Sequence, residues 1–175
     1  ARSGFWYSHM GWLFDMRYER VITSRPKYLM KFPELVWLDR YYYLPTVALA
    51  VAAGACFGWP GLFVSYGLST VLTFHATFCV NSLCHMFGTR RFDVSDDSRN
   101  NWFVALIMLG GGWHNNHHRY PHSARQGILW WEVDVTYYVL RALAFFHLIR
   151  DIYEPTAARA IRANGGHVAR VASKS

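Results

Sequence analysis

The run GWHNNHHRYPH contains three histidines at the spacing HxxHH, which are His114, His117 and His118. An α-helix has about 3.6 residues per turn, so positions i, i+3 and i+4 lie on one face and would carry all three imidazoles. Neutral imidazole is a common ligand for iron, zinc, copper and nickel. The alternative is a chance cluster of polar surface histidines. We favour a metal-binding edge, because the run lies near a long uncharged stretch.

Two polar residues lie near the end of that uncharged stretch, Asn81 and His85. They are four residues apart and would share one face of a helix. Polar side chains at membrane depth are costly and usually have a function. Both could instead hydrogen-bond to a neighbouring helix. Because the HxxHH histidines should lie at the same membrane face, we expect metal coordination to include His85.

Other ionisable residues are weaker candidates. Asp93, Asp96 and Asp97 lie beside arginines, so we expect a solvated, mutually paired loop rather than further metal ligands. His9 lies in an aromatic segment, where it is a candidate for packing or for support of a ligand. Four imidazoles and one amide would suit one metal ion but are few for two.

The elements that must position these residues begin with the uncharged stretch, which runs from Tyr41 to Thr89. It is interrupted by GWPG at residues 58–61, whose proline and glycines favour a turn. A membrane-spanning helix needs about 20 apolar residues, and each half approaches this length. A buried hairpin of a soluble protein would show the same pattern. We expect two transmembrane helices, over residues 42–58 and 61–87.

The remaining elements are shorter. Residues 1–40 are broken by prolines and predict short helices along the membrane surface. A short apolar helix is expected over residues 102–109 and an interfacial amphipathic helix over 133–149. The predicted fold is all-α, an integral membrane protein with two transmembrane helices, interfacial helices and a cytosolic helix carrying the histidine box. Residues 1–154 would form one domain, followed by a disordered basic tail, 155–175.

Charge and aromatic content favour a lipid bilayer as partner. The chain has a formal net charge of +7, and aromatic residues make up 18% of it. Trp and Tyr collect at membrane interfaces, whereas the basic residues flank the apolar stretch and form no compact nucleic-acid patch. We therefore expect no nucleic-acid partner. Since basic flanks stay in the cytoplasm, both termini and the metal site should be cytoplasmic.

Three of these segments resemble the C-terminal half of membrane acyl-CoA (delta-9, stearoyl-type) fatty acid desaturases. They are NSLCHMFG at 81–88, DDSRNN at 96–101 and GWHNNHHRYPHSARQG at 112–127. The segment GFWYSHMGW at residues 4–12 resembles the one that follows the second histidine box of that family. The segment at 112–127, which matches the third histidine box of the family with its flanks, is highly specific. The similarity extends from residue 4 to about residue 150.

The resemblance implies a non-haem diiron centre held by histidine boxes. The residues that match iron ligands are His85, His114, His117 and His118. Asn81 matches a position that contacts one iron through water. The implied fold is the helical membrane fold already expected from the uncharged stretch.

The resemblance also implies the reaction. With O2 and two electrons, such an enzyme introduces a cis double bond into a saturated fatty acyl chain, here expected as the acyl-CoA thioester. Thr77 and Phe78 match positions lining the bend of the acyl tunnel, and Arg17 lies near positions that meet the CoA phosphates. An electron donor such as ferredoxin or cytochrome b5 would be required.

Two departures from the family pattern bear on activity. The earlier HxxxxH and HxxHH boxes do not occur in this sequence, so we expect a C-terminal portion that is inactive in isolation. Gly111 stands where relatives often have Glu, which would alter hydrogen bonding around the third box. The alternatives are a diiron lipid hydroxylase and a non-catalytic metal-binding membrane protein.

Overall fold

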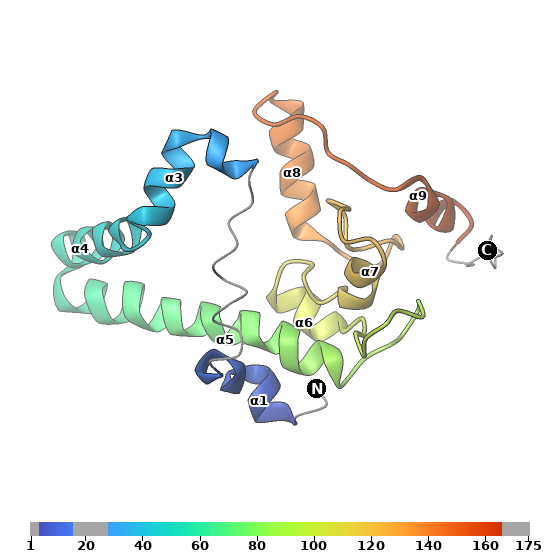
Figure 1. Ribbon diagram of the computed structural model, residues 1–175, viewed down its shortest axis with the longest axis horizontal. Coiled ribbons are helices and arrows are strands. Elements are labelled where there is room, and N and C mark those ends of the chain that lie inside the picture. The colour runs from blue at the N-terminus through green and yellow to red at the C-terminus, as the bar shows by residue number, and fades with distance from the viewer. Residues whose placement is uncertain (1–3, 16–27, 166–175) are drawn as a thin grey trace. The chain divides into compact units, whose positions relative to one another are not determined.

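The computed structural model describes residues 4–15 and 28–165 (Figure 1). Its regular elements in these ranges are all helical, and the only sheet-like pairing there is two isolated bridges, Thr89 with Asn100 and Asn100 with Trp113. The predicted all-α class is thus confirmed for this part of the chain. Arg17, the expected contact to CoA, lies outside the described residues.

The chain divides into two units, one formed by residues 10–75 and the other by 1–9 together with 76–175. The described elements of the first unit are η1 (Gly11–Phe14), η3 (Leu29–Lys31), α3 (Pro33–Arg40), α4 (Tyr43–Pro60), η4 (Gly61–Leu68) and the start of α5 (Ser69–Ser82). η4 is a π-helix and continues directly into α5. The short helices expected before residue 40 are present in the described part.

The chain reverses direction between α4 and η4 (Figure 1), as the turn residues at 58–61 predict. Gly58 has φ 63° and ψ −150°, a conformation that favours glycine. The next helix starts close against α4, because a Cβ atom on Gly61 would lie 2.1 Å from the carbonyl oxygen of Ala53. Glycine therefore serves two purposes here, reversing the chain and allowing close approach.

One helical segment among the described residues is long and apolar enough to cross a membrane, the 43 residues Tyr43–His85. Two separate spans were expected, but helical hydrogen bonding continues through the reversal, with the Gly61 amide donating to the carbonyls of Phe57 and Gly58. Straightened, 43 residues would extend about 65 Å, roughly twice the hydrocarbon core of a bilayer. Two crossings stay a prediction.

The second unit contains the four histidines that were predicted as metal ligands, His85, His114, His117 and His118. Its helices are α1 (Phe5–His9), the end of α5, η5 (Leu83–His85), α6 (Trp102–Ile107), α7 (His114–Arg119), α8 (Val135–Phe145) and α9 (Thr156–Ala163). α6 and α8 lie inside the ranges expected for helices. α6 is capped by Asn101, whose side chain accepts hydrogen bonds from the amides of Phe103 and Val104, and α8 is capped by Asp134.

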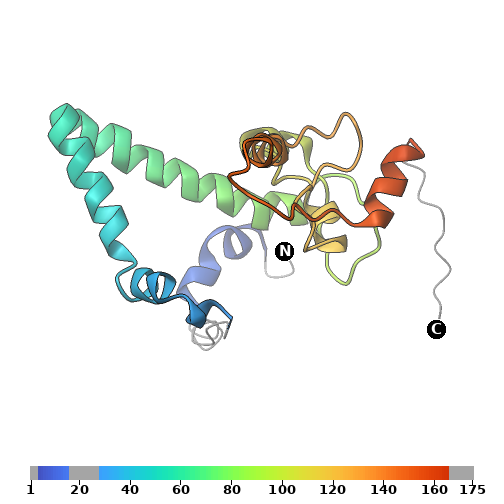
Figure 2. The ribbon, with the colours of Figure 1, turned by 90° about the horizontal axis from the view of Figure 1, so that it is seen from above.

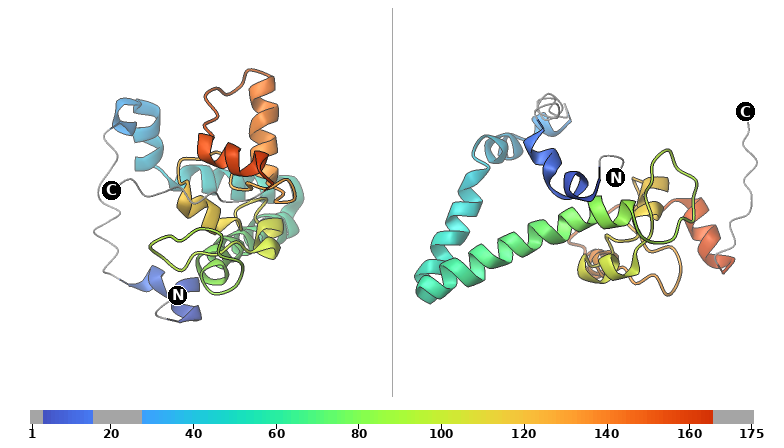
Figure 3. Two further views of the ribbon diagram at one scale, coloured as in Figure 1. Left: turned by 90° about the vertical axis from the view of Figure 1, so that its right-hand side faces the viewer. Right: turned by 90° about the horizontal axis from the view of Figure 1, so that it is seen from below.

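Part of the basic tail expected from residue 155 is helical in this structure, because Thr156–Ala163 form α9. After α8 the chain runs through an extended segment to this helix (Figure 2), and the second unit ends with it among the described residues (Figure 3). Ala158 and Ile161 of α9 are buried in a small core with Phe92 and Ile128. The alanines were read as part of a frayed basic tail, but their spacing produces an apolar face that packs.

Candidate metal centre

Three imidazoles from two segments meet in the second unit. His85 ends both η5 and the long apolar segment, whereas His114 and His118 lie one turn apart on α7. The Nε2 atom of His114 is 3.0 Å from Nε2 of His85 and 2.9 Å from Nε2 of His118. One nitrogen from each ring lies within 4.8 Å of the other two. We call these three residues the imidazole cluster.

The cluster has the donor set and spacing of a metal site. Nitrogens that bind one metal at about 2.0–2.1 Å and at about right angles lie about 3 Å apart. Two of the nitrogen pairs in the cluster have this separation. The three Nε2 atoms would need protons to hydrogen-bond to one another, whereas one metal ion would use all three lone pairs. The residues therefore fit a metal.

His117 lies beside the cluster but is not one of the three. Its ring stacks on that of His114 at a centroid distance of 5.9 Å. Its Nδ1 atom is buried and has no hydrogen-bond partner in the part of the chain that the structure describes. Buried polar atoms rarely stay unpaired, because the loss of water is uncompensated. This nitrogen is therefore free to bind a metal as well.

Two imidazoles on α7, those of His114 and His117, are held in the form that metals require. Burial, together with the charges of neighbouring imidazoles, lowers the pKa of His114 to about 3. Burial and the charge of His118 also lower the pKa of His117. Both rings are therefore neutral at pH 7, and neutral imidazole carries the lone pair that a metal ion uses.

Asp96 differs from the solvated residue that the sequence indicated. One carboxylate oxygen contacts Nδ1 of His118, and the other accepts a hydrogen bond of 2.8 Å from the Ser98 amide. Burial alone would raise the pKa of Asp96, but the hydrogen bonds from Ser98 and the charge of His118 outweigh it and lower the pKa to about 2. Asp93, by contrast, is exposed and pairs with Arg90, as expected.

Asn115 fixes the loop that carries Asp96 to the helix that carries the histidines. It is fully buried on α7. Its Oδ1 atom accepts hydrogen bonds from the amides of Arg91 and Phe92, at 2.9 and 2.7 Å. Its Nδ2 atom donates to the carbonyls of Phe92 and Ser98, at 3.0 and 3.1 Å. One side chain therefore holds both ends of the segment from residue 91 to 98.

A second buried network begins at Asn116. Its Nδ2 atom donates to the Gln126 carbonyl and to the carboxylate of Glu132. Glu132 is completely buried and forms a two-pronged ion pair with Arg91, at 2.6 and 3.0 Å. The amides of Ile128 and Leu129 also donate to Glu132. The buried side chains of Asn116 and Glu132 thus have partners for their polar atoms, as such networks require.

The sequence analysis missed Asn115, Asn116 and Glu132 as residues that shape the site. The available signal was weak. Asparagine is unfavourable in a helix interior. The two asparagines between the histidines of HNNHH therefore indicate that their amides form hydrogen bonds in the protein interior. Glu132 follows two tryptophans in an apolar context, where an acid is expected to have a partner.

Gly112 sets the distance between α6 and the start of α7. A Cβ atom at this position would lie 2.0 Å from the Ala105 amide nitrogen and 2.4 Å from the Asn101 carbonyl oxygen. Replacing Gly112 by alanine is therefore expected to lower the unfolding midpoint clearly, because backbone atoms must move. Thermal unfolding of the purified protein measures this. Gly111→Ala is the matched control, since its nearest contacts are at 3.2 and 3.4 Å, and equal midpoints would contradict the expectation.

Three other predicted site residues lie on α5, apart from the cluster. Asn81 is exposed and makes no hydrogen bond to the cluster among the described residues. Thr77 is exposed, and Phe78 packs edge-on against His9 at 5.7 Å. His9 is buried and its Nδ1 atom lies 3.0 Å from the hydroxyl of Ser82, which supports the packing role expected for it.

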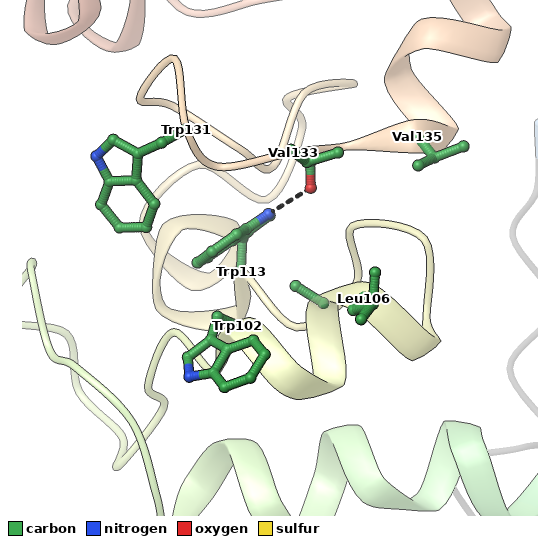
Figure 4. A pocket seen from close by; sticks show the side chains of 7 residues that line it. Trp102, Leu106, Trp113, Trp131, Val133 and Val135 are labelled. Carbon is green, nitrogen blue, oxygen red and sulfur yellow. Dashed lines mark hydrogen bonds between the residues drawn. The ribbon is translucent and has the colours of Figure 1, made fainter.

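An apolar pocket of about 200 Å³ lies beside the residue that precedes His114 (Figure 4). The residues lining it are Trp102, Ala105, Leu106, Trp113, Trp131, Val133 and Val135. The indole nitrogen of Trp113 donates a 2.8 Å hydrogen bond to the Val133 carbonyl, which fixes the ring in the pocket wall. Neither Thr77 nor Phe78 lines this pocket.

Comparison with known proteins agrees with the geometry. Residues 1–155 match the fatty acid desaturase family. An sn-2 palmitoyl-lipid 9-desaturase of Nostoc sp. is 41% identical over 156 residues, which are 87% of this chain and 55% of that protein. An acyl-CoA C20 Delta5-desaturase of Anemone leveillei is 38% identical over 158 residues, 87% of this chain and 50% of the relative.

A third relative, an sn-1 stearoyl-lipid 9-desaturase of Synechocystis sp., is 40% identical over 158 residues, which are 89% of this chain and 49% of that protein. The chain thus spans about half the length of the curated relatives it matches. Their names include lipid-linked and CoA-linked acyl substrates and two double-bond positions.

Proposed function

Since this chain belongs to the fatty acid desaturase family, we propose that it supplies part of the active site of an enzyme that inserts a cis double bond into a saturated fatty acyl chain, using O2 and two electrons. The observation that carries this proposal is the meeting of imidazoles from two segments 29 residues apart in sequence, at the end of a long apolar helical segment. In this proposal the metal site would lie where an acyl chain could reach it from a membrane.

In this proposal the chain holds part of a non-haem diiron centre. The imidazole cluster would bind one iron, and His117, whose Nδ1 is buried and unpaired among the described residues, is available to the second. Asn81 would contact iron through water. When bound, iron and O2 would supply the oxidising power that removing hydrogen from an unactivated methylene demands. The side chains of this chain position the reacting groups and exclude water.

The acyl chain is proposed to pass along α5. Thr77 and Phe78 would line the bend of its tunnel, since they lie on this helix about two turns before His85. The expected substrate is an acyl-CoA, with Arg17 near the CoA phosphates. Relatives named for acyl-lipid substrates make a glycerolipid-bound acyl chain the main alternative.

The membrane arrangement belongs to the same proposal. α4 and the segment η4–α5 would cross the bilayer as two spans joined at Gly58–Gly61, with both termini and the imidazole cluster on the cytoplasmic side. The basic flanks and the exposed apolar side chains of α4 and α5 support it. An electron donor such as ferredoxin or cytochrome b5 would deliver the two electrons.

The test is product analysis with the complete gene product expressed in cells that lack their own desaturase. We expect a saturated acyl substrate to yield the corresponding alkene and the purified protein to contain two irons. Parallel assays with acyl-CoA and with acyl-glycerolipid show whether the acyl substrate is attached to CoA or to a glycerolipid. A hydroxyacyl product without alkene would show a hydroxylase instead. One zinc ion or no metal, with no product, would show a non-catalytic binding protein.

A further inference from the structure

Both ring nitrogens of His118 are engaged, each by a different kind of partner. Nε2 faces the imidazole cluster, 2.9 Å from His114, while Nδ1 contacts a carboxylate oxygen of Asp96. An ionised carboxylate only accepts hydrogen bonds, so the proton of a neutral His118 ring must be on Nδ1. The lone pair is then on Nε2, the atom that faces the cluster.

Asp96 is itself held in place by a closed chain of contacts. Its second carboxylate oxygen accepts the Ser98 amide at 2.8 Å, and Ser98 is fully buried. The Ser98 carbonyl accepts from Nδ2 of Asn115, which lies on α7 three residues before His118. The contacts therefore lead from α7 through the loop and back to α7. Movement of the carboxylate away from the ring would break the partly buried hydrogen bond from the Ser98 amide.

We propose that Asp96 is a positioning residue, which holds His118 in the Nδ1–H tautomer and aims its Nε2 lone pair at the metal position. A metal-binding histidine usually donates its other N–H to a carboxylate, carbonyl or water, and losing that partner typically costs 10- to 100-fold in metal affinity. The inference rests on the metal site of the proposed function. It assigns to the loop at residues 91–98 a role in the chemistry of the centre.

Asp96→Asn tests this role with little change in shape. The Asn oxygen can still accept the Ser98 amide, and its NH2 group then points at Nδ1 of His118. Because NH2 only donates there, Nδ1 must accept, and the ring must carry its proton on Nε2. The tautomer is expected to reverse in the metal-free protein, as read by nitrogen-15 NMR of the His118 side chain. Affinity for Co²⁺, measured by optical titration of the purified protein, is expected to fall 10- to 100-fold.

Asp93→Asn is the matched control, since Asp93 lies in the same loop but is exposed and pairs with Arg90. It is expected to leave the His118 tautomer and Co²⁺ affinity unchanged. Asp96→Ala, which introduces no opposing donor, is expected to give a mixture of tautomers and a smaller loss of affinity than Asp96→Asn.

Three outcomes would overturn the proposal. They are an unchanged Nδ1–H tautomer in Asp96→Asn, an unchanged Co²⁺ affinity in that variant, or a loss of affinity accompanied by unfolding in a thermal melt. If the unaltered protein binds no metal, the proposed function fails. The tautomer measured in the metal-free protein still decides whether Asp96 orients His118.

Discussion

In the complete gene product, where desaturation is proposed, His114→Ala is expected to remove iron binding and desaturation together. His114 is the centre of the cluster, since its Nε2 atom lies within 3.0 Å of Nε2 of both His85 and His118. Alanine would leave two imidazoles without the ligand that joins the two segments. Loss of an outer partner of a ligand already costs 10- to 100-fold in affinity, so loss of the ligand itself should exceed about 100-fold. Iron content per chain and the alkene yield from a saturated acyl substrate are the measurements.

The matched control is His122→Ala. His122 lies eight residues after His114 and is exposed in a turn after α7, so its removal should change neither iron content nor yield. The prediction would be contradicted if His114→Ala retained full iron and normal turnover. A folded His114→Ala protein is needed for the comparison, and a circular dichroism spectrum matching that of the unaltered protein establishes it.

The residues of the candidate metal centre could be predicted where short-range sequence patterns identify them. Helical spacing placed His114 and His118 on one face, and a polar residue at the end of an apolar stretch singled out His85. The structure brings these three together. Their role as iron ligands stays a proposal, because ligation involves iron as well as the protein. The roles of Asn81, Thr77, Phe78 and Arg17 stay proposals for the same reason, since they concern contacts to iron or to the acyl substrate.

What could not be predicted arises from tertiary contacts. Asp93 and Asp96 lie in one acidic loop and look alike in sequence, yet one is exposed and the other contacts His118. The difference follows from the four hydrogen bonds of Asn115, which fold the loop onto α7. Local patterns of charge carry no information about such long-range bonds. The same is true of α9, whose burial depends on Phe92 and Ile128.

The all-α class was predictable because the apolar stretch and helical periodicities are local signals. The number of membrane crossings was not, since it depends on how the chain continues after Gly58. The positive φ there reverses the chain within one hydrogen-bonded helical segment, which a pattern of apolar residues cannot distinguish from two helices joined by a loop. The turn residues predicted the site of reversal but not its geometry.

Glu132→Ala is expected to have the largest effect on stability, although Glu132 contacts none of the histidines in the cluster. Its carboxylate is completely buried and accepts hydrogen bonds from Arg91, Asn116 and two backbone amides. Removing one partner of a buried ion pair typically costs about 3–5 kcal/mol, because the other charge is left unpaired. For a domain of this size the unfolding midpoint should fall by on the order of 10 °C. Thermal unfolding in detergent, followed by circular dichroism, measures this.

Two causes of this loss of stability can be distinguished, the unpaired charge of Arg91 and the cavity left by the shorter side chain. If the unpaired Arg91 causes most of the destabilisation, the double variant Glu132→Leu with Arg91→Met should be more stable than Glu132→Leu alone, since removing both charges often costs little. Asp93→Ala serves as the control, because its ion pair with Arg90 is exposed and should hardly affect the midpoint. A midpoint for Glu132→Ala equal to that of Asp93→Ala would refute the view that this carboxylate holds α7 in place through Asn116. α7 would then be held by Asn115, which binds the loop at residues 91–98, and by the hydrogen bonds between Asn100 and Asn116.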